Sequence, residues 1–280
     1  MNTSKITTTI PGKIMLTGEY CVMEGEFSLS YTIDKSLHIT CKRSSSSKTV
    51  VESNLWKTPY ICDDHTYLSA KQKSHPVLGT IDFYKKLHGL GPVHVSIDSQ
   101  LDPTAGVGSS SALRIGLLLS LAALNNDDFF NNLTRKDVFD IAFHAKRLQQ
   151  EQQKKLASGY DVITQLVGGC ISFKPNWQKD PGTILPHRID TEKMQQVVHL
   201  FVNHKGAKTK TILPATWKWI QSEQLLPSIK KASQQLLSTL VTTLENPQPQ
   251  QELSTLIDQV KNHRQIFEPS PFFPSYLIEN

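Results

Sequence analysis

Apolar and polar residues alternate along the N-terminal part of the chain, which is the pattern of half-buried β-strands. Residues 5–15 predict a strand carried through a Pro-Gly turn, and residues 28–44 predict one or two further strands. Residues 44–54, SSSSKTVVESN, predict a polar hairpin, and residues 60–74 an irregular segment. Residues 93–101 alternate again and predict another strand. The first third of the chain is therefore expected to be mainly β-sheet.

Helical spacing replaces this alternation in several later segments. Residues 76–90 predict a helix that a Gly-Pro pair stops, and residues 110–124 predict a second one. A third helix starts at Thr134, where Asp137 completes a capping-box pattern. Its apolar positions recur every three or four residues and form a core-facing stripe: Val138, Ile141, Ala142, Ala145 and Leu148.

The C-terminal third has a different pattern from the rest. Residues 168–175 predict a short strand, and residues 195–211 predict a strand, a glycine turn and the beginning of a helix. Residues 213–244 and 250–266 are helical in spacing, separated by ENPQPQQ. We therefore place a domain boundary near residue 190, giving domains 1–190 and 191–280. Strands and helices in separate blocks predict an α+β fold.

Composition excludes several classes of protein. The 280 residues suffice for one large or two modest domains, with 38% hydrophobic and 20% charged residues. The net charge of +5 suits anionic small molecules, but no basic block is dense enough to indicate nucleic acid. The four cysteines form no CxxC pair, so neither a disulfide framework nor a zinc site is predicted.

The longest apolar run, residues 115–124, is shorter than the ~20 residues that span a bilayer. The start of the sequence has no apolar signal segment. We therefore expect a cytoplasmic protein with no membrane partner.

The segment DPTAGVGSSSAL, residues 102–113, has the composition of an anion-binding loop. Gly106 and Gly108 can adopt positive φ, so that backbone N–H groups can converge on a phosphate at the start of a helix. Ser109, Ser110 and Ser111 can cap the helix, bind phosphate oxygens or ligate Mg²⁺. No lysine follows Gly108, so the loop is not the P-loop of nucleotide-binding proteins. A glycine turn with serine caps explains the same residues equally well.

Two further segments accompany this loop: PGKIMLTGEYCVMEG at residues 11–25 and SGYDVITQLVGG at residues 158–169. Taken in their order along the chain, the three segments resemble the motifs of the GHMP kinases, the superfamily of galactokinase, homoserine kinase, mevalonate kinase and phosphomevalonate kinase. Tyr20 in GEY and the run QKKLASGYD at residues 153–161 are similar to the phosphomevalonate kinase branch. The resemblance covers essentially the whole chain.

The resemblance implies catalytic roles for two residues. Asp161 would take or orient the proton of the acceptor, although it could instead cap the following helix. Lys13 would lie beside Asp161, keep it ionised and offset charge on the transferred group, although it could be an exposed strand lysine. Glu19 would pair with Lys13 or support the loop, and a surface ion pair is an equal alternative.

The resemblance also implies the binding residues. The phosphates of ATP would lie on the loop residues Pro103, Gly106, Val107, Gly108, Ser109, Ser110 and Ser111. Mg²⁺ would contact Ser110. Mevalonate kinases carry an acidic Mg²⁺ ligand eleven residues before the aspartate, where this chain has Gln150. Glu151 beside it could serve only with a shifted helix register, and otherwise belongs to the polar face of the helix.

The acceptor would contact Glu19, Tyr20, Ser158, Gly159 and Lys208. Ser158 can equally be a turn residue, and Lys208 and Lys210 can equally face solvent. Residues 60–90 are the segment in which we look for the adenine pocket.

The resemblance therefore implies an ATP- and Mg²⁺-dependent kinase with a β/α phosphate-binding domain and a ferredoxin-like C-terminal domain. It would convert 5-phosphomevalonate to the diphosphate in isoprenoid precursor synthesis, as a monomer or homodimer. Mevalonate kinase, another alcohol or sugar kinase of the superfamily, and a non-catalytic ATP-binding regulator are the alternatives. An RNA-binding role would need aromatic residues interleaved with Lys and Arg, which are absent.

Family members carry a third, glycine-rich motif near their C-terminal end. This sequence ends at PFFPSYLIEN, where that motif is expected to begin. The resemblance thus implies either a shortened sequence or a natural short variant that binds without turnover.

Overall fold

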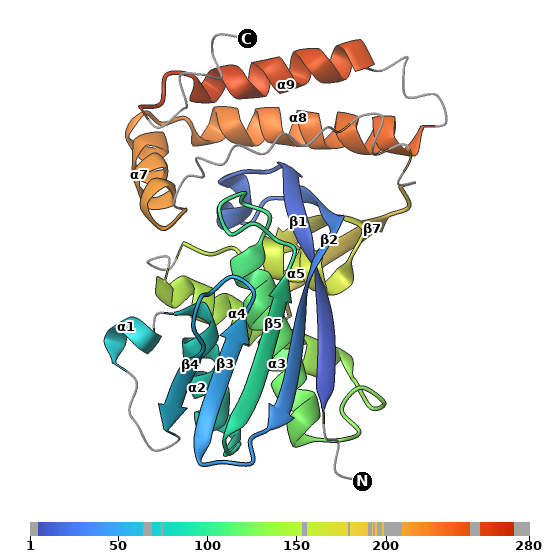
Figure 1. The fold of residues 1–280 in the computed structure, drawn as a ribbon. Coiled ribbons are helices and arrows are strands. Elements are labelled where there is room, and N and C mark those ends of the chain that lie inside the picture. Colours follow the sequence, from blue (N-terminus) through green and yellow to red (C-terminus); the bar gives the residue numbers. More distant parts are fainter. Residues whose placement is uncertain are drawn as a thin grey trace.

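A computed structural model describes residues 5–63, 69–73, 75–152, 156–178, 180–189, 192, 194, 198, 209–246 and 253–271. It shows a mixed α+β fold in which a strongly twisted sheet carries helices on one face and three further helices across one end (Figure 1). The sheet orders its strands β4-β3-β5-β2-β6-β7, and β1 pairs with β2 in addition.

The centre of the sheet is the long strand β2, Ser28–Arg43. It pairs along its length with β1, Ile6–Thr17, in an antiparallel ladder whose register shifts between Pro11 and Lys13. The predicted Pro-Gly turn is therefore an irregularity within one continuous strand. On its other edge, β2 pairs with β5, Val93–Ser99, near one end and with β6, Cys170–Pro175, near the other. One strand thus connects both parts of the sheet.

The predicted hairpin at residues 44–54 is wrong. Residues Lys48–Ser53 form β3, which pairs in parallel with β5 and antiparallel with β4, Tyr60–Asp63. Because β5 lies between β2 and β3, the turn after β2 is not a hairpin. The segment expected to be irregular also contains β4 and the short helix α1, Ala70–Lys73. The edge strand β7, Gly182–His187, was not predicted.

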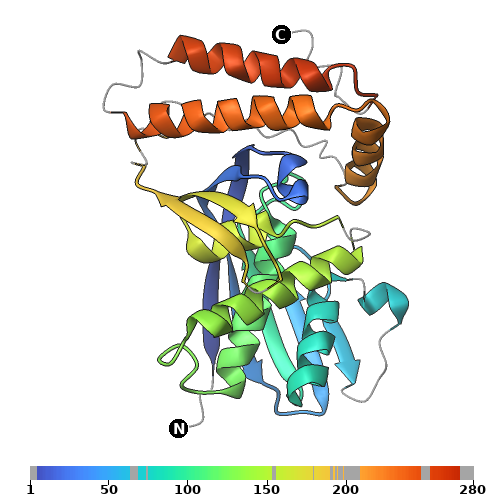
Figure 2. The same ribbon diagram turned by 180° about the vertical axis from the view of Figure 1, so that it is seen from behind.

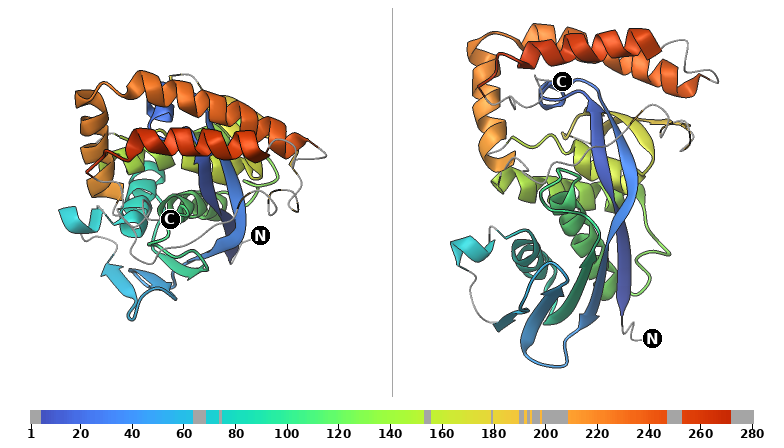
Figure 3. Two further views of the ribbon diagram at one scale, coloured as in Figure 1. Left: turned by 90° about the horizontal axis from the view of Figure 1, so that it is seen from above. Right: turned by 45° about the horizontal axis from the view of Figure 1, so that its top comes forward.

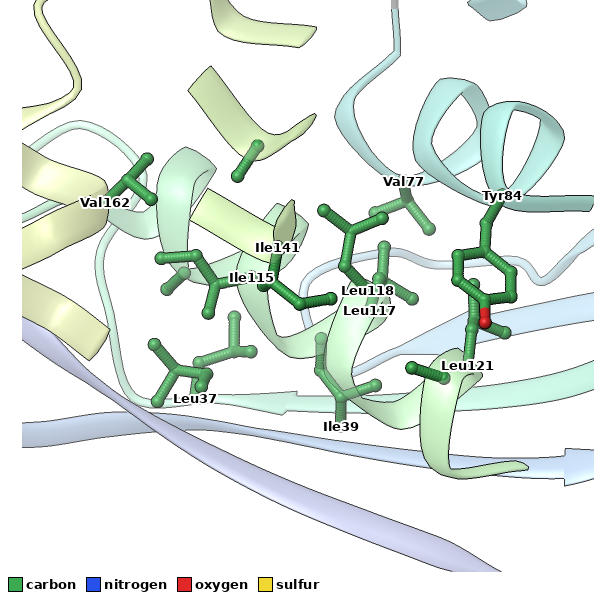
Figure 4. Close-up of a cluster of buried hydrophobic side chains, with 14 of the residues drawn as sticks. Leu37, Ile39, Val77, Tyr84, Ile115, Leu117, Leu118, Leu121, Ile141 and Val162 are labelled. Carbon is green, nitrogen blue, oxygen red and sulfur yellow. The ribbon is translucent and has the colours of Figure 1, made fainter. Parts of the chain in front are cut away.

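Helices cover one face of the sheet, as the view from behind shows (Figure 2). Helix α3, Ser109–Asn125, packs on β1 and β2 and is covered in turn by α2, Pro76–His88, and α4, Arg135–Gln152. Helix α3 is apolar on nearly all sides because it is enclosed between the two layers. Its Ile115, Leu117, Leu118 and Leu121 are the centre of the main core (Figure 4).

The short helices η1, Cys21–Glu24, and α5, Tyr160–Val167, lie near the end of the sheet that carries the last three helices. These are α7, Thr209–Ser222, α8, Leu226–Glu245, and α9, Leu253–Phe267. Helices α8 and α9 run side by side over this end (Figure 3). Two smaller apolar clusters join them to the rest, around Leu29 and Leu240 and around Cys21 and Ile229.

The single helical segment expected over 213–244 is wrong, because Gln224 has φ 54° and Pro227 follows it, which separates α7 from α8. The expected boundary near residue 190, and the strand expected within 195–211, fall on a stretch of which only short parts are described. The ferredoxin-like arrangement and the two-domain division therefore stay predictions. No described helix combines the length and the apolar run that crossing a bilayer would require.

Candidate active site

One cavity of about 330 Å³ brings together the three sequence segments singled out above. We call it the site cavity. It lies between the glycine loop, β1, the segment after β1 and the start of α5, and Leu213 of α7 reaches it from the C-terminal helices. Its polar lining consists mainly of predicted residues: Lys13, Glu19, Tyr20, Ser109, Ser110, Ser111, Gln149, Ser158, Tyr160 and Asp161, with backbone from Gly106, Gly108 and Gly159.

The glycine loop leads directly into the N-terminus of α3. Gly106 and Gly108 have φ of 71° and 81°, and Gly108 is the N-cap residue. A glycine cap has no side chain to satisfy the first N–H groups of the helix, so these donors and the positive end of the helix dipole are left for an anion. Pro103 also lines the site cavity, whereas the side chain of Val107 is buried in the main core.

Lys13 and Gln165 hold the loop against β1. The backbone N–H of Lys13 donates to the Val107 carbonyl at 2.9 Å, and Gln165 Nε2 donates to the carbonyls of Gly108 and Pro11. A Cβ atom on Gly108 would lie 3.0 Å from both Lys13 and Gln165, so the close packing needs glycine. Gln165 was not a predicted site residue. Gln165 follows Asp161 by one turn of α5, and this spacing in the sequence indicates that the two side chains share one face of the helix.

Two of the three serines are already hydrogen-bonded within the protein. Ser111 Oγ donates to the Gly108 carbonyl at 2.9 Å, and Ser110 Oγ accepts from Arg114 Nη1 at 2.6 Å. Arg114 also donates to the Ser110 carbonyl and is only 1% exposed. Burial lowers the pKa of Arg114 to about 10, against the attraction of Asp161. A buried guanidinium beneath the loop is a feature that the sequence analysis missed.

Lys13 extends from β1 into the site cavity with 6% of its surface exposed. Its ammonium donates to Tyr160 Oη at 2.7 Å and to the Gly106 carbonyl at 3.3 Å, and lies 4.8 Å from the centre of the Tyr160 ring. Burial alone would lower the pKa of Lys13, but Tyr160 and the charge of Asp161 outweigh it, so the pKa is raised. The lysine is therefore a cation at neutral pH.

Asp161 occupies the first turn of α5, where both carboxylate oxygens have a donor. Oδ1 accepts the N–H of Val162 at 2.9 Å, and Oδ2 accepts Gln149 Nε2 at 2.7 Å. Gln149 comes from α4 and is 3% exposed. The carboxylate is thus oriented by its own helix and by a neighbouring one.

Three successive residues of α4 face three different cavities, because each residue turns the helix by about 100°. Gln149 lines the site cavity, Gln150 lines a second cavity with Trp177, and Glu151 lines a third. The predicted metal ligand Glu151 therefore does not reach the site and instead pairs with Arg147 at 3.7 Å. The residue that does reach it, Gln149, follows Ala145 by four positions and so continues the predicted core-facing stripe.

The predicted Mg²⁺ ligands do not fit a common metal site. Ser110 lies in the loop with its hydroxyl held by Arg114, and Glu151 faces a different cavity. Among the described residues, no group of three His, Cys, Asp or Glu side chains lies close enough together to hold a metal ion. We therefore assign no resident metal to these residues.

Glu19 and Tyr20 connect the site cavity to the C-terminal helices. Glu19 does not pair with Lys13 as first expected; its Oε2 lies 3.9 Å from Nε2 of His263 in α9. Tyr20, at φ 62°, stacks on Trp217 of α7 with ring centres 6.4 Å apart and contacts Phe267. His263 was not a predicted site residue, and no local pattern in the sequence indicates it.

Ser158 and Gly159 form the turn before α5. The Ser158 carbonyl accepts Trp177 Nε1 at 2.8 Å, and Gly159 has φ 82° with no room for a Cβ, which would lie 2.5 Å from the Trp177 ring. Lys146 Nζ lies over the Trp177 ring, 4.7 Å from its centre. The predicted acceptor residue Lys208 lies outside the described residues, as does the side chain of Lys210.

The third cavity, about 170 Å³, is lined in part by Arg114, the residue that also binds Ser110 of the glycine loop. We call it the α2–α4 cavity; it is lined by Lys73, His75, Pro76, Gly79, Thr80, Arg114, Leu148 and Glu151. His75 also contacts Trp56 and Tyr60, with ring centres 5.4 Å apart in both pairs. The cavity falls within the segment where an adenine pocket was expected.

Comparison with known proteins finds similarity in both sequence and fold. Residues 75–169 match the family described as GHMP kinases N terminal domain. The mevalonate kinase of Aeropyrum pernix is 27% identical over 173 residues, covering 59% of this chain and 49% of that protein. The mevalonate kinase of Archaeoglobus fulgidus is 24% identical, covering 58% and 51%. The chain matches about half the length of these curated relatives.

Solved structures share the fold over nearly the whole chain. The Methanococcus jannaschii mevalonate kinase superimposes with a TM-score of 0.69 and 17% identity, covering 97% of this chain and 82% of that one. The Streptococcus pneumoniae phosphomevalonate kinase in complex with phosphomevalonate and AMPPNP gives 0.61 and 15% identity, covering 94% and 80%. At these identities the similarity establishes the fold.

Proposed function

We propose that this chain, whose residues 75–169 match the N-terminal domain of the GHMP kinases, transfers the γ-phosphoryl group of ATP to a small anionic acceptor, 5-phosphomevalonate first of all. The observation that carries this proposal is the site cavity itself. It combines a glycine loop at a helix N-terminus, a protonated lysine and an oriented carboxylate within one enclosure. Phosphoryl transfer depends mainly on positioning and on charge stabilisation, and these groups supply both.

In this proposal the N–H groups at the start of α3 bind the phosphates of ATP. Gly106 has open space where a Cβ would stand, so its backbone can approach a phosphate closely. Ser109 and the partly exposed loop around Ser110 add hydroxyl groups. Mg²⁺ enters as part of the donor substrate Mg·ATP, held mainly by phosphate oxygens and water.

Lys13 stabilises the negative charge of the transferred group, because its ammonium is fixed at the cavity wall between the loop and α5. Asp161 accepts or orients the proton of the acceptor oxygen. Such a group contributes about 10²–10⁴-fold where it acts. Tyr20, Glu19 and Ser158 line the same cavity and would contact the acceptor.

We also propose that the α2–α4 cavity holds the nucleobase. Arg114 lines it, and the guanidinium of the same residue binds Ser110 in the loop. His75 and Pro76 supply flat apolar surface, and Thr80 and Glu151 supply polar groups that can select a base. Substituting His75 by alanine is expected to raise the KM for ATP and leave the KM for the acceptor unchanged.

Two acceptors have support from different observations. Tyr20 and the run at residues 153–161 resemble the phosphomevalonate kinases, which favours 5-phosphomevalonate. The curated relatives that the chain matches are named mevalonate kinases, which favours mevalonate. Both acceptors carry a carboxylate and present an oxygen nucleophile beside Lys13. Asp161 would accept the hydroxyl proton of mevalonate, whereas the phosphate of 5-phosphomevalonate is mostly unprotonated at neutral pH and would need Asp161 mainly for its orientation.

The test is release of ADP from Mg·ATP with 5-phosphomevalonate, mevalonate and galactose in parallel. Asp161→Asn removes the carboxylate charge, and Asp140→Asn on the exposed face of α4 is the matched control. We expect turnover with 5-phosphomevalonate that only Asp161→Asn abolishes. Turnover with mevalonate alone would identify mevalonate as the acceptor. Turnover with galactose alone would contradict both proposed acceptors.

The non-catalytic alternative predicts a different result. ATP would then raise the thermal unfolding midpoint, while none of the acceptors released ADP. If ATP neither raised the unfolding midpoint nor released ADP with any acceptor, nucleotide binding, and with it the proposed function, would be contradicted.

A further inference from the structure

We infer that Gln149 is a positioning residue that orients the Asp161 carboxylate. This role rests on the proposed function, since it makes Gln149 part of the phosphoryl-transfer site. The direct observation is the 2.7 Å hydrogen bond from Gln149 Nε2 to Asp161 Oδ2, made between α4 and α5. An amide N–H can donate to an ionised carboxylate, and bonds of this kind are among the stronger ones in proteins.

The two donors on Asp161 fix the carboxylate plane. Val162 N–H binds Oδ1 from within α5, and Gln149 binds Oδ2 from α4. Removing either leaves one point of attachment, about which the carboxylate can rotate. With both, one lone pair of each oxygen is used by the protein, and the second stays available to an acceptor proton.

The orientation of the Gln149 amide follows from the charge of Asp161. Gln149 Oε1 is buried and has no hydrogen-bond partner among the described residues. Turning the amide over would place this oxygen against the carboxylate, which is unfavourable while Asp161 is ionised. The amide therefore directs its N–H group to the carboxylate, and Oε1 is left without a hydrogen bond among the described residues.

Charged groups from several elements surround Asp161. Lys13 approaches from β1 and Arg114 from α3, and both interact electrostatically with Asp161. Tyr160 precedes it in α5 and binds Lys13. Glu19, from the segment after β1, is the acidic group that lines the same cavity. Gln149 adds a neutral donor, so it orients the carboxylate without adding net charge to the site.

The neighbouring Gln150 provides a matched control. It has the same side chain on the same helix, but its Nε2 donates to the Ala157 carbonyl at 3.3 Å and it lines a different cavity. Gln149→Met removes the donor while keeping the side-chain length, and Gln150→Met makes the same change away from Asp161.

We expect Gln149→Met to lower kcat about 10-fold or more with little change in the KM for ATP, because a bond to a charged group is lost. Gln150→Met should leave kcat within about twofold. Gln149→Glu should be the least active at neutral pH, because two carboxylates would then face each other. Its activity relative to wild type should rise as the pH falls, since one shared proton restores a hydrogen bond.

A second readout does not depend on turnover. The carboxyl carbon of Asp161 can be followed by NMR during a pH titration of the wild type, Gln149→Met and Gln150→Met. We expect the midpoint to move to higher pH in Gln149→Met alone. If the wild type releases no ADP but this shift occurs, the proposed function fails and the positioning role stands. Equal midpoints in all three proteins, or equal kcat values, would overturn the role of Gln149.

Discussion

The ammonium of Lys13 donates a 2.7 Å hydrogen bond to the phenolic oxygen of Tyr160, the residue immediately before Asp161. The same lysine donates its backbone N–H to Val107 in the glycine loop. Lys13 thus ties the loop to the helix that carries the carboxylate. Because this contact joins β1 to α5, the charged groups of the site keep their spacing as long as the sheet and α5 stay packed.

Substituting Lys13 by methionine should remove the charge while keeping most of the packing. We expect kcat to fall by about 10²–10³-fold, the size found when one preorganised donor to a transition state is removed. Tyr160→Phe removes only the hydroxyl, so Lys13 keeps its charge and its bond to Gly106, and kcat should fall less than about 10-fold. Steady-state kinetics would decide, and a Lys13→Met enzyme with the kcat of the wild type would exclude Lys13 from catalysis.

The two loop glycines should respond differently to alanine. Gly108→Ala places a Cβ 3.0 Å from Lys13 and Gln165, so we expect loss of both stability and activity. A Cβ on Gly106 meets no protein atom within 4 Å, so the cost there is the φ of 71°, about 1–2 kcal/mol. Gly106→Ala should nevertheless weaken ATP binding, because the methyl group blocks the approach of a phosphate.

Urea unfolding and ATP titration of the two variants separate these effects. If Gly106→Ala bound ATP as tightly as the wild type, the phosphates would not lie against Gly106.

Gly159→Ala should destabilise the protein by about 2–4 kcal/mol, from the left-handed backbone and from overpacking. Its Cβ would lie 2.5 Å from the Trp177 ring. Gly89→Ala is the matched control, since Gly89 is also left-handed, at φ 66°, with open space around it. We expect about 1–2 kcal/mol for Gly89→Ala. Equal values from denaturant unfolding would show that Trp177 moves aside freely.

Protonation of His75 should lower the stability of the protein. Its Nδ1 accepts the Val77 N–H at 3.3 Å as the N-cap of α2, and only the neutral ring can accept. Burial and then the charge of Arg114 lower the pKa of His75 below its ordinary value of 6.5. The unfolded chain therefore binds the proton first, and stability falls as the pH drops below about 6.5.

His75→Asn keeps a capping oxygen without the titration. The free energy of unfolding of this variant, measured between pH 7.5 and 5.5, should depend less steeply on pH than that of the wild type. An unchanged slope would mean that other groups cause the acid sensitivity.

Short-range interactions account for the elements that the pattern predicted well. The N–H of Thr134 donates to Asp137 Oδ2 at 2.9 Å, and the N–H of Asp137 donates to Thr134 Oγ1 at 3.2 Å, as a capping box requires. Helix α3 begins directly after Gly108, because glycine can adopt the cap conformation and the apolar run then continues the helix. Such features involve residues within one turn of each other, so their spacing in the sequence is sufficient evidence.

Strand order was decided by contacts between distant segments. Val50 pairs with His94 of β5 and not with β2, although the residues between β2 and β3 look like a hairpin turn. Turn residues show that the chain reverses, but they do not specify which strand lies beside it. That choice depends on how β3 and β5 bury their apolar faces against α2 and α3.

The candidate site shows the same division between local pattern and packing. The glycine loop, Lys13 and Asp161 stand in recognisable local patterns, and the structure brings them to one cavity. The amide that binds Asp161 is different, since Gln149, Gln150 and Glu151 all have suitable chemistry and adjacent numbers. The rotation of α4 against α3 and α5 selects Gln149, because side chains one position apart on a helix point about 100° apart. That rotation is set by the burial of Ile141, Ala142 and Ala145 in the core, which is a property of the folded chain.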